Sequence, residues 1–129
     1  MNWLVHTPQR AIHVIDPDPQ TREGLQSLLG TLNAEVKTYA SAERFLSQPL
    51  PEPLGCLIAE VNLPGMSGIE LLEYLHSVGL NLPAILLSRQ SDVPTAVRAM
   101  QTGAVDFLEK PFINNTLIKR VRKILERTG

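Results

Sequence analysis

Short apolar runs alternate with stretches of helical periodicity along almost the whole chain of 129 residues. The runs contain β-branched residues and are bounded by turn formers, which is typical of short buried strands. They comprise residues 11–16, 34–39, 55–60, 83–88 and 104–109. Between the runs, leucine, isoleucine and valine recur at steps of three and four, as on one face of a helix. The pattern therefore predicts strands that are each followed by one helix.

Helix starts and stops agree with this alternation. Asp18 precedes a proline and is a predicted N-cap, whereas Asn33 is expected to be the left-handed residue after that helix. Residues 67–70 have the serine-to-glutamate pattern of a capping box. Ser91 or Asp92 is expected to start the fourth helix. These signals place helix ends in the gaps between the predicted strands.

Single helices between strands require crossover connections, which favour a parallel sheet with right-handed crossovers and helices on both faces. The expected fold class is therefore α/β, a doubly wound five-stranded parallel sheet with five helices. We assign it to residues 11–129 as one domain and expect residues 1–10 to form an N-terminal arm.

Composition limits the setting in which this domain works. No apolar stretch is long enough to span a membrane, and the start of the chain lacks the pattern of a secretory signal. A formal net charge of −1 gives no overall attraction to nucleic acid or to anionic lipid. The single cysteine, Cys56, lies in an apolar run and is expected to be a buried, inert thiol. These features predict a cytoplasmic protein without membrane contact.

Polar side chains follow several of the predicted strands. Asp16, Glu60, Ser88 and Lys110 lie at the carboxyl ends, where open α/β sheets bind ligands and carry out chemistry. Glu60 follows "CLIA" and precedes Val61, and an unpaired carboxylate is unfavourable in such apolar surroundings. We therefore expect an ion pair between Glu60 and Lys110.

Other assignments remain open on sequence alone. Asp16, which Pro17 holds in an extended conformation, is either a turn aspartate or a ligand for a metal or a proton. Ser88 is either a turn cap or a hydroxyl that binds a phosphoryl oxygen or a carboxylate. The three histidines lack ligand spacing and are expected to be structural. The chain has no glycine-rich phosphate loop, GxSxG, CxxC or HExxH, so it is not expected to be an enzyme.

Three stretches in order carry a family resemblance, namely "TYASAERFL", "LPGMSGIELL" and "TAVRAMQTGAVDFLEKPF". Together they resemble the response-regulator receiver domain of two-component signalling, over about residues 10–128. The first stretch is similar to the FixJ-like branch, whose members usually carry a LuxR-type DNA-binding output domain. The resemblance implies the (βα)5 flavodoxin-like receiver fold with strand order 2-1-3-4-5. It also implies that an output domain is expected outside this sequence, with a single-domain protein as the alternative.

The resemblance implies an altered phosphorylation site. Glu60 stands where receivers carry the phosphoacceptor aspartate, and Asp16 and Pro17 stand where they carry the acidic pair that holds Mg²⁺. The backbone carbonyl at Asn62 falls on the third metal position. Glutamate carries its carboxylate about 1.5 Å further than aspartate, and proline offers no side-chain oxygen. We therefore expect no cofactor and weak or absent Mg²⁺ binding by Asp16, Glu60 and Asn62.

The remaining family positions match. Ser88 falls on the switch hydroxyl, Phe107 on the aromatic switch and Lys110 on the lysine of the receiver site. We interpret the chain as a pseudo-receiver, a phosphorylation-independent regulatory and dimerisation module in signal transduction and transcription control. In this interpretation Glu60 partly mimics phospho-aspartate. The alternative is a working phosphoacceptor that receives phosphate from a histidine kinase on Asp16, Asp18 or Ser88.

The resemblance also implies partners. A homodimer is expected through the face formed by the fourth helix, fifth strand and fifth helix, with interface residues Val93, Val97, Arg98, Gln101 and Lys119. A sensor histidine kinase is a further expected partner, and DNA is expected to be reached only through an output domain. A flavodoxin-like cofactor binder shares the same sheet order, but the strand-end loops lack the aromatic pair that would sandwich a flavin.

Overall fold

The computed structural model describes residues 10–49, 54–89 and 92–127. The strands are β1 (Ala11–Ile15), β2 (Glu35–Tyr39), β3 (Leu54–Glu60), β4 (Ala84–Ser88) and β5 (Asp106–Glu109). The helices are α1 (Pro19–Leu29), the 3-10 turn η2 (Gly30–Leu32), α2 (Ala42–Leu46), α3 (Gly68–Ser77), α4 (Val93–Gln101) and α5 (Asn114–Arg127).

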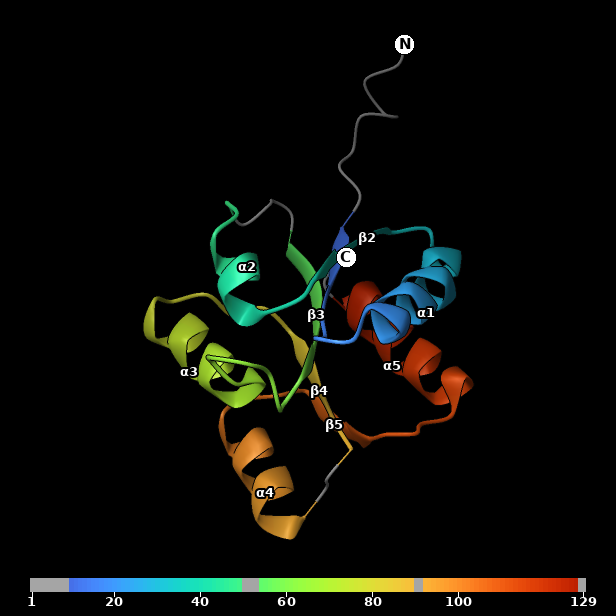
Figure 1. Ribbon diagram of the computed structural model, residues 1–129. Helices are drawn as coiled ribbons and strands as arrows, with labels where there is room; N and C mark the ends of the chain where they lie inside the picture. Colours follow the sequence, from blue (N-terminus) through green and yellow to red (C-terminus); the bar gives the residue numbers. More distant parts are fainter. Residues whose placement is uncertain (1–9, 50–53, 90–91, 128–129) are drawn as a thin grey trace.

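The strands form one parallel sheet in the order β2-β1-β3-β4-β5. Helices α2, α3 and α4 cover one face of the sheet, and α1 and α5 cover the other (Figure 1). This arrangement confirms the expected doubly wound fold and its strand order. All the strands point in the same direction, so the carboxyl ends of β1, β3 and β5 lie along one edge.

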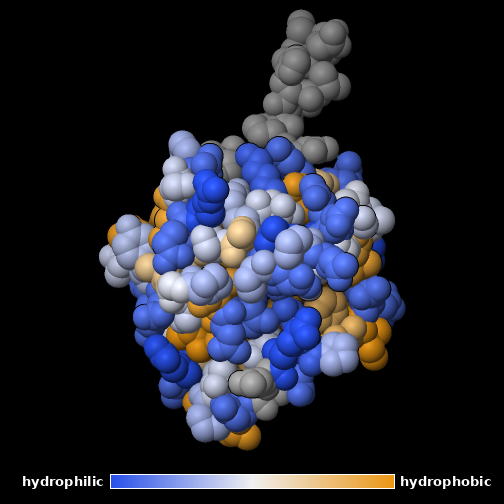
Figure 2. Space-filling model, in the orientation of Figure 1, coloured by the Kyte–Doolittle hydropathy of each residue, from blue (hydrophilic) through white to orange (hydrophobic). Residues whose placement is uncertain are grey.

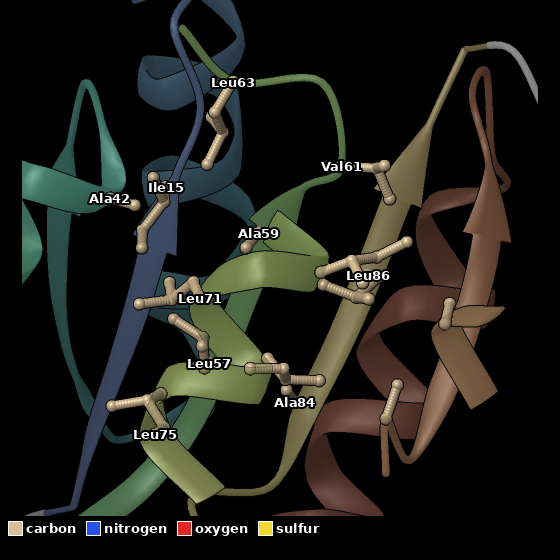
Figure 3. Packing of buried hydrophobic residues seen from close by; sticks show 14 of the residues in the cluster. Ile15, Ala42, Leu57, Ala59, Val61, Leu63, Leu71, Leu75, Ala84 and Leu86 are labelled. Atoms are coloured by element: carbon tan, nitrogen blue, oxygen red, sulfur yellow. The ribbon is translucent and has the colours of Figure 1, made fainter. Parts of the chain in front are cut away.

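Two apolar cores fill the space between the sheet and its helix layers. On the side of α2, α3 and α4, Leu71 and Leu75 of α3 lie over Leu57 of β3 and Ala84 of β4 (Figure 3). On the side of α1 and α5, buried residues include Leu29, Ile58 and Val121. Strand residues that alternate in sequence therefore enter opposite cores, and both faces of the sheet are buried.

The helix caps follow the sequence signals. Asp18 and Asp92 cap α1 and α4 through the backbone amides of Thr21 and Thr95, and Ser67 forms the capping box of α3 with Glu70. Asn33 is left-handed, with φ of 52°, as expected. Ser91 and residues 1–9 of the predicted arm lie outside the described residues, whereas Arg10 donates a hydrogen bond to the carbonyl of Leu125 in α5.

The larger apolar side chains of α4 do not face the core. Val93 is 76% exposed, and Val97 and Met100 are each 48% exposed, whereas Ala99 is buried. The small alanine allows α4 to approach the sheet closely, so the larger side chains remain on the outer side of the helix. Elsewhere, on the face shown in Figure 2, hydrophilic side chains dominate and the apolar patches are small and separate. No helix among the described residues has the length and hydrophobicity of a membrane span.

Candidate functional site

Three strand ends bring two carboxylates and one ammonium together. Nζ of Lys110, directly after β5, lies 2.6 Å from Oδ2 of Asp16 and 2.8 Å from Oε1 of Glu60. Asp16 is only 2% exposed and Glu60 only 5% exposed. The ion pair expected between Glu60 and Lys110 is therefore confirmed. The second pair, with Asp16, is an addition that the sequence analysis did not predict.

Every oxygen of the two carboxylates accepts a hydrogen bond. Besides their bonds from Lys110, Oδ1 of Asp16 accepts from the amide of Asp18 at 2.9 Å, and Oε2 of Glu60 accepts from the amide of Asn62 at 3.0 Å. The backbone carbonyl of Asp16 also accepts from the guanidinium of Arg22 at 2.6 Å. Buried carboxylates are stable only when paired in this way.

The backbone holds Lys110 between the carboxylates. Its amide donates to the carbonyl of Ser88 at 2.8 Å, and the following bond to Pro111 is cis, as the Lys-Pro sequence allowed. Burial disfavours the charge on Lys110, but the hydrogen bonds from its ammonium to Asp16 and Glu60, together with the negative charges of these two residues, outweigh burial. The pKa of Lys110 is therefore raised above its usual value, and the lysine is a permanent cation at neutral pH.

The loop after β3 depends on two glycines and a carboxylate. Gly65 has φ of +74°, a backbone conformation that side chains disfavour, and a Cβ on Gly68 would lie 2.5 Å from the carbonyl oxygen of Glu60. Glu43 of α2 accepts a hydrogen bond from the amide of Met66 at 2.8 Å. The close approach of α3 to the end of β3 thus fixes the backbone that carries Glu60.

Pro17 and Asp18 do not extend the carboxylate cluster. Pro17 is exposed and has no side-chain donor atom. Asp18 accepts bonds from the hydroxyl and the amide of Thr21 at 2.7 and 3.2 Å, so it caps α1. The hydroxyl bond is the main reason why the pKa of Asp18 is lowered. Among the described residues there is no group of three or more histidine, cysteine or acidic side chains arranged for a metal.

The two expected switch residues lie on the neighbouring strands β4 and β5. Ser88 is fully buried at the end of β4, and Phe107 is half-buried against the core on the side of α3. Within the described part of the chain, the Glu60 carboxylate is bonded to Lys110 and to the amide of Asn62, not to Ser88. The longer side chain of glutamate therefore reaches the lysine and not the hydroxyl.

Two other titratable side chains lie in the core, away from this site. Burial raises the pKa of the Cys56 thiol to about 12, in agreement with an inert cysteine. His13 of β1 is fully buried, stacks on Tyr39 and meets the edge of Phe45. Its ring contacts make His13 a packing residue, as the sequence analysis expected.

Sequence analysis missed the supporting residues. Arg22 bonds to the carbonyl of Asp16, and Glu43 bonds to the backbone of Met66 in another segment. Residue type and spacing gave no sign of these roles. The pair between Asp16 and Lys110 had a usable signal, because both residues end parallel strands of one sheet. Their meeting across the intervening strands, however, depends on the reach of the lysine side chain.

Comparisons with known proteins agree with this geometry. Residues 12–122 match the family described as response regulator receiver domain. The transcriptional regulatory protein FixJ of Azorhizobium caulinodans is 43% identical over 118 residues, which cover 92% of this chain and 56% of the relative. The chain thus spans about half the length of this curated relative.

Solved structures give the same result. A response regulator receiver protein from Pseudoalteromonas atlantica superposes with a TM-score of 0.88 at 39% identity, covering 92% of this chain and 99% of that one. Full-length FixJ from B. japonicum gives a TM-score of 0.84 at 35% identity, covering 95% of this chain and 61% of that one.

Proposed function

The chain belongs to the family of response regulator receiver domains, and from that premise we propose that it is a pseudo-receiver, a regulatory module that works without phosphorylation. In this proposal Glu60 replaces the phosphoacceptor aspartate and Pro17 replaces one of the metal-binding acids. The chain acts as a binding and switching module in signal transduction and transcription control, not as an enzyme.

The observation that carries the proposal is the Lys110 ammonium held between Asp16 and Glu60. An acceptor carboxylate must present an oxygen in line with the incoming phosphoryl group, and a displacement of about 1 Å already lowers such rates strongly. Both oxygens of Glu60 are occupied by bonds to Lys110 and to the backbone. The carboxylate is therefore poorly disposed to act as a nucleophile.

The same arrangement does not suit Mg²⁺. This cation needs near-octahedral oxygen ligands, usually with one or two carboxylates among them. Both carboxylates here already neutralise Lys110, and Pro17 contributes no side-chain oxygen. We infer that the ammonium takes the place of a divalent cation as the counter-charge of the site, so Mg²⁺ would have to displace it.

Glu60 is also proposed to be a partial mimic of phospho-aspartate. Its carboxylate already forms, without any phosphate, an ion pair with the lysine of the receiver site. A carboxylate carries less charge than a phosphoryl group, and no bond to Ser88 accompanies the pair, so the mimicry acts through Lys110. Glu60→Gln, which keeps the shape but removes the charge, should therefore change self-association. Unchanged association in that variant would refute the mimicry.

Phosphorylation is tested by intact mass after incubation with acetyl phosphate and Mg²⁺. We expect no phosphoryl adduct on the wild-type protein or on Pro17→Asp, and a clear adduct on the double variant Glu60→Asp/Pro17→Asp. The single variant Glu60→Asp separates the two changes, because an adduct on it would show that the acceptor alone prevents the reaction. A stable adduct on the wild-type protein would contradict the proposal.

The alternative acceptors have little support in the structure. Ser88 is fully buried and Asp16 is 2% exposed and paired with Lys110, so neither is open to a phosphodonor. Asp18 is more accessible, but its carboxylate caps α1. Mapping any adduct by peptide mass would decide between these positions.

Self-association is proposed through the face formed by α4, β5 and α5. Val97, Met100 and Val105 are each at least 45% exposed on or beside this face, an apolar surface that a second copy could cover. Lys119 and Gln101 are exposed there as well. Arg98 is partly engaged, because its guanidinium lies 3.5 Å from Glu73 of α3.

The face is tested by the oligomeric state of Val97→Asp. A charge in the middle of an apolar contact remains unpaired when the copies meet, so we expect dimerisation to weaken at least roughly tenfold. Sedimentation equilibrium gives the dissociation constant. Val78→Asp is the matched control, because Val78 is 51% exposed at the end of α3 and outside the face. Equal dimerisation of wild type and Val97→Asp would place the interface elsewhere.

The wider setting follows from the family. Receiver domains exchange signals with sensor histidine kinases and with output domains, and we propose both as partners of the full-length protein. DNA would be bound by the output domain alone, since the net charge of this chain gives no attraction to it. The proposed location is the cytoplasm.

A further inference from the structure

A cavity of about 510 Å³ has Lys110 in its lining. It is bounded by the start of α1, the residue after β4 and the segment between β5 and α5. Its lining consists of Thr21, Arg89, Lys110, Pro111, Phe112 and Asn114. Small-molecule sites in proteins have volumes of about 300–1,000 Å³, so this cavity has the size of a ligand pocket.

The cavity is lined by apolar walls and a few polar groups. Phe112 and Pro111 supply an aromatic and an aliphatic wall, and Thr21 and Asn114 supply neutral hydrogen-bonding groups. None of the described residues in the lining carries a carboxylate, although Lys110 is paired with Asp16 and Glu60. Apolar walls with a few polar groups are typical of sites that bind small organic molecules.

The charge available to a ligand comes mainly from Arg89. Lys110 is already shared between two carboxylates, whereas Arg89 is exposed and forms no ion pair with another residue that the structure describes. Arg89 acts electrostatically on Asp18, but the Asp18 carboxylate is occupied in capping α1. A guanidinium binds a carboxylate with two parallel hydrogen bonds, which makes it a selective anion receptor.

We propose that this cavity binds a small organic carboxylate, with its apolar body against Phe112 and its carboxylate on Arg89. The proposal goes beyond the pseudo-receiver function and does not depend on it, because binding is measurable whatever the phosphorylation state. Binding of this carboxylate would give the domain a regulatory signal. The ligand would sit against the lysine that bridges Asp16 and Glu60, so its occupancy would be sensed at the carboxylate cluster.

Benzoate is the probe for the test, because it joins an aromatic body to one carboxylate. Titration into labelled protein, followed by amide chemical shifts, should give saturable shifts centred on Thr21, Arg89, Phe112 and Asn114. Benzamide, which lacks the charge, and acetate, which lacks the ring, should each bind at least roughly tenfold more weakly. Equal affinities for benzoate and acetate would refute the role of the apolar wall.

Arg89→Met tests the anion receptor. Because Arg89 is exposed, the variant should fold normally. Amide chemical shifts that match those of the wild-type protein away from the cavity would confirm this. Benzoate should bind it at least roughly tenfold more weakly than wild type. The matched control is Arg44→Met, since Arg44 lines another cavity of about 530 Å³ between β2 and α2.

Besides equal affinities for benzoate and acetate, three outcomes would overturn the proposal. The first is that benzoate does not bind saturably. The second is that Arg44→Met and Arg89→Met weaken benzoate binding equally. The third is that the amide chemical-shift changes centre on β2 and α2. Saturable shifts at the cavity that are lost in Arg89→Met and kept in Arg44→Met would establish it.

Discussion

Replacement of Lys110 by methionine is expected to lower the free energy of unfolding by about 3–5 kcal/mol at neutral pH. The substitution preserves the length of the side chain but leaves Asp16 and Glu60 without their ammonium. Both carboxylates are at most 5% exposed, so water cannot replace the lost hydrogen bonds. Removal of one partner from a buried ion pair is therefore much more destabilising than loss of a surface pair. Urea denaturation provides the measurement.

The pH dependence of this loss has a defined sign. In the wild-type protein the raised pKa of Lys110 means that its stabilisation is complete below its usual value of 10.5 and is lost only as the pH rises through the folded value.

Two further variants make this prediction specific. Lys119→Met removes an exposed lysine of α5 and should change stability by less than about 0.5 kcal/mol. Adding Glu60→Gln to Lys110→Met removes one of the two buried charges and should recover part of the loss. A deficit of less than about 1 kcal/mol in Lys110→Met would mean that the pairs with Asp16 and Glu60 contribute little.

The sequence was sufficient for the architecture because local signals and periodicity agreed. The alternation of strands and helices required crossovers, and caps such as Asp18 and Ser67 placed the helix starts correctly. The same reasoning predicted that Glu60 and Lys110 would pair, because a carboxylate in an apolar run needs a cation and both residues end strands of one sheet. These inferences rest on rules that operate over short distances or along the whole sheet.

The details of side-chain reach could not be obtained in this way. The sequence did not show that Lys110 also forms an ion pair with Asp16. Nor did it show that the Glu60 carboxylate accepts a hydrogen bond from the amide of Asn62 and not from the hydroxyl of Ser88. It also did not show which side of α4 faces the sheet. Both sides of this helix carry apolar residues, and the side with Ala99 is buried whereas the larger side chains are exposed. Such outcomes depend on distances of a few ångströms in the assembled structure.

The core contains a second titratable group whose burial has a large expected effect. His13 is fully buried, and Nδ1 of its ring lies 3.0 Å from the hydroxyl of Tyr39. Its other ring nitrogen, Nε2, has no hydrogen-bond partner in the part of the chain that the structure describes. Burial, with a smaller contribution from Lys37 and an opposing one from Glu35, lowers the pKa of His13 to about 4. The folded protein therefore strongly favours the neutral ring.

Acid should consequently destabilise the fold through His13. Between pH 6.5 and about 4 the unfolded chain binds a proton on this histidine and the folded chain does not, so stability falls as the pH falls. At pH 4.5 the loss should be about 2–3 kcal/mol. Urea denaturation of the wild-type protein and of His13→Gln at pH 7.5 and 4.5 measures it, because the variant lacks the titrating ring and should lose correspondingly less.

Two comparisons separate this effect from the general response to acid. His76→Gln removes an exposed histidine of α3 and should leave the acid sensitivity of the wild-type protein unchanged. Titration of the His13 ring by NMR should show that it stays neutral down to pH 5. If wild type and His13→Gln lost the same stability between pH 7.5 and 4.5, the unpartnered Nε2 would not govern acid sensitivity.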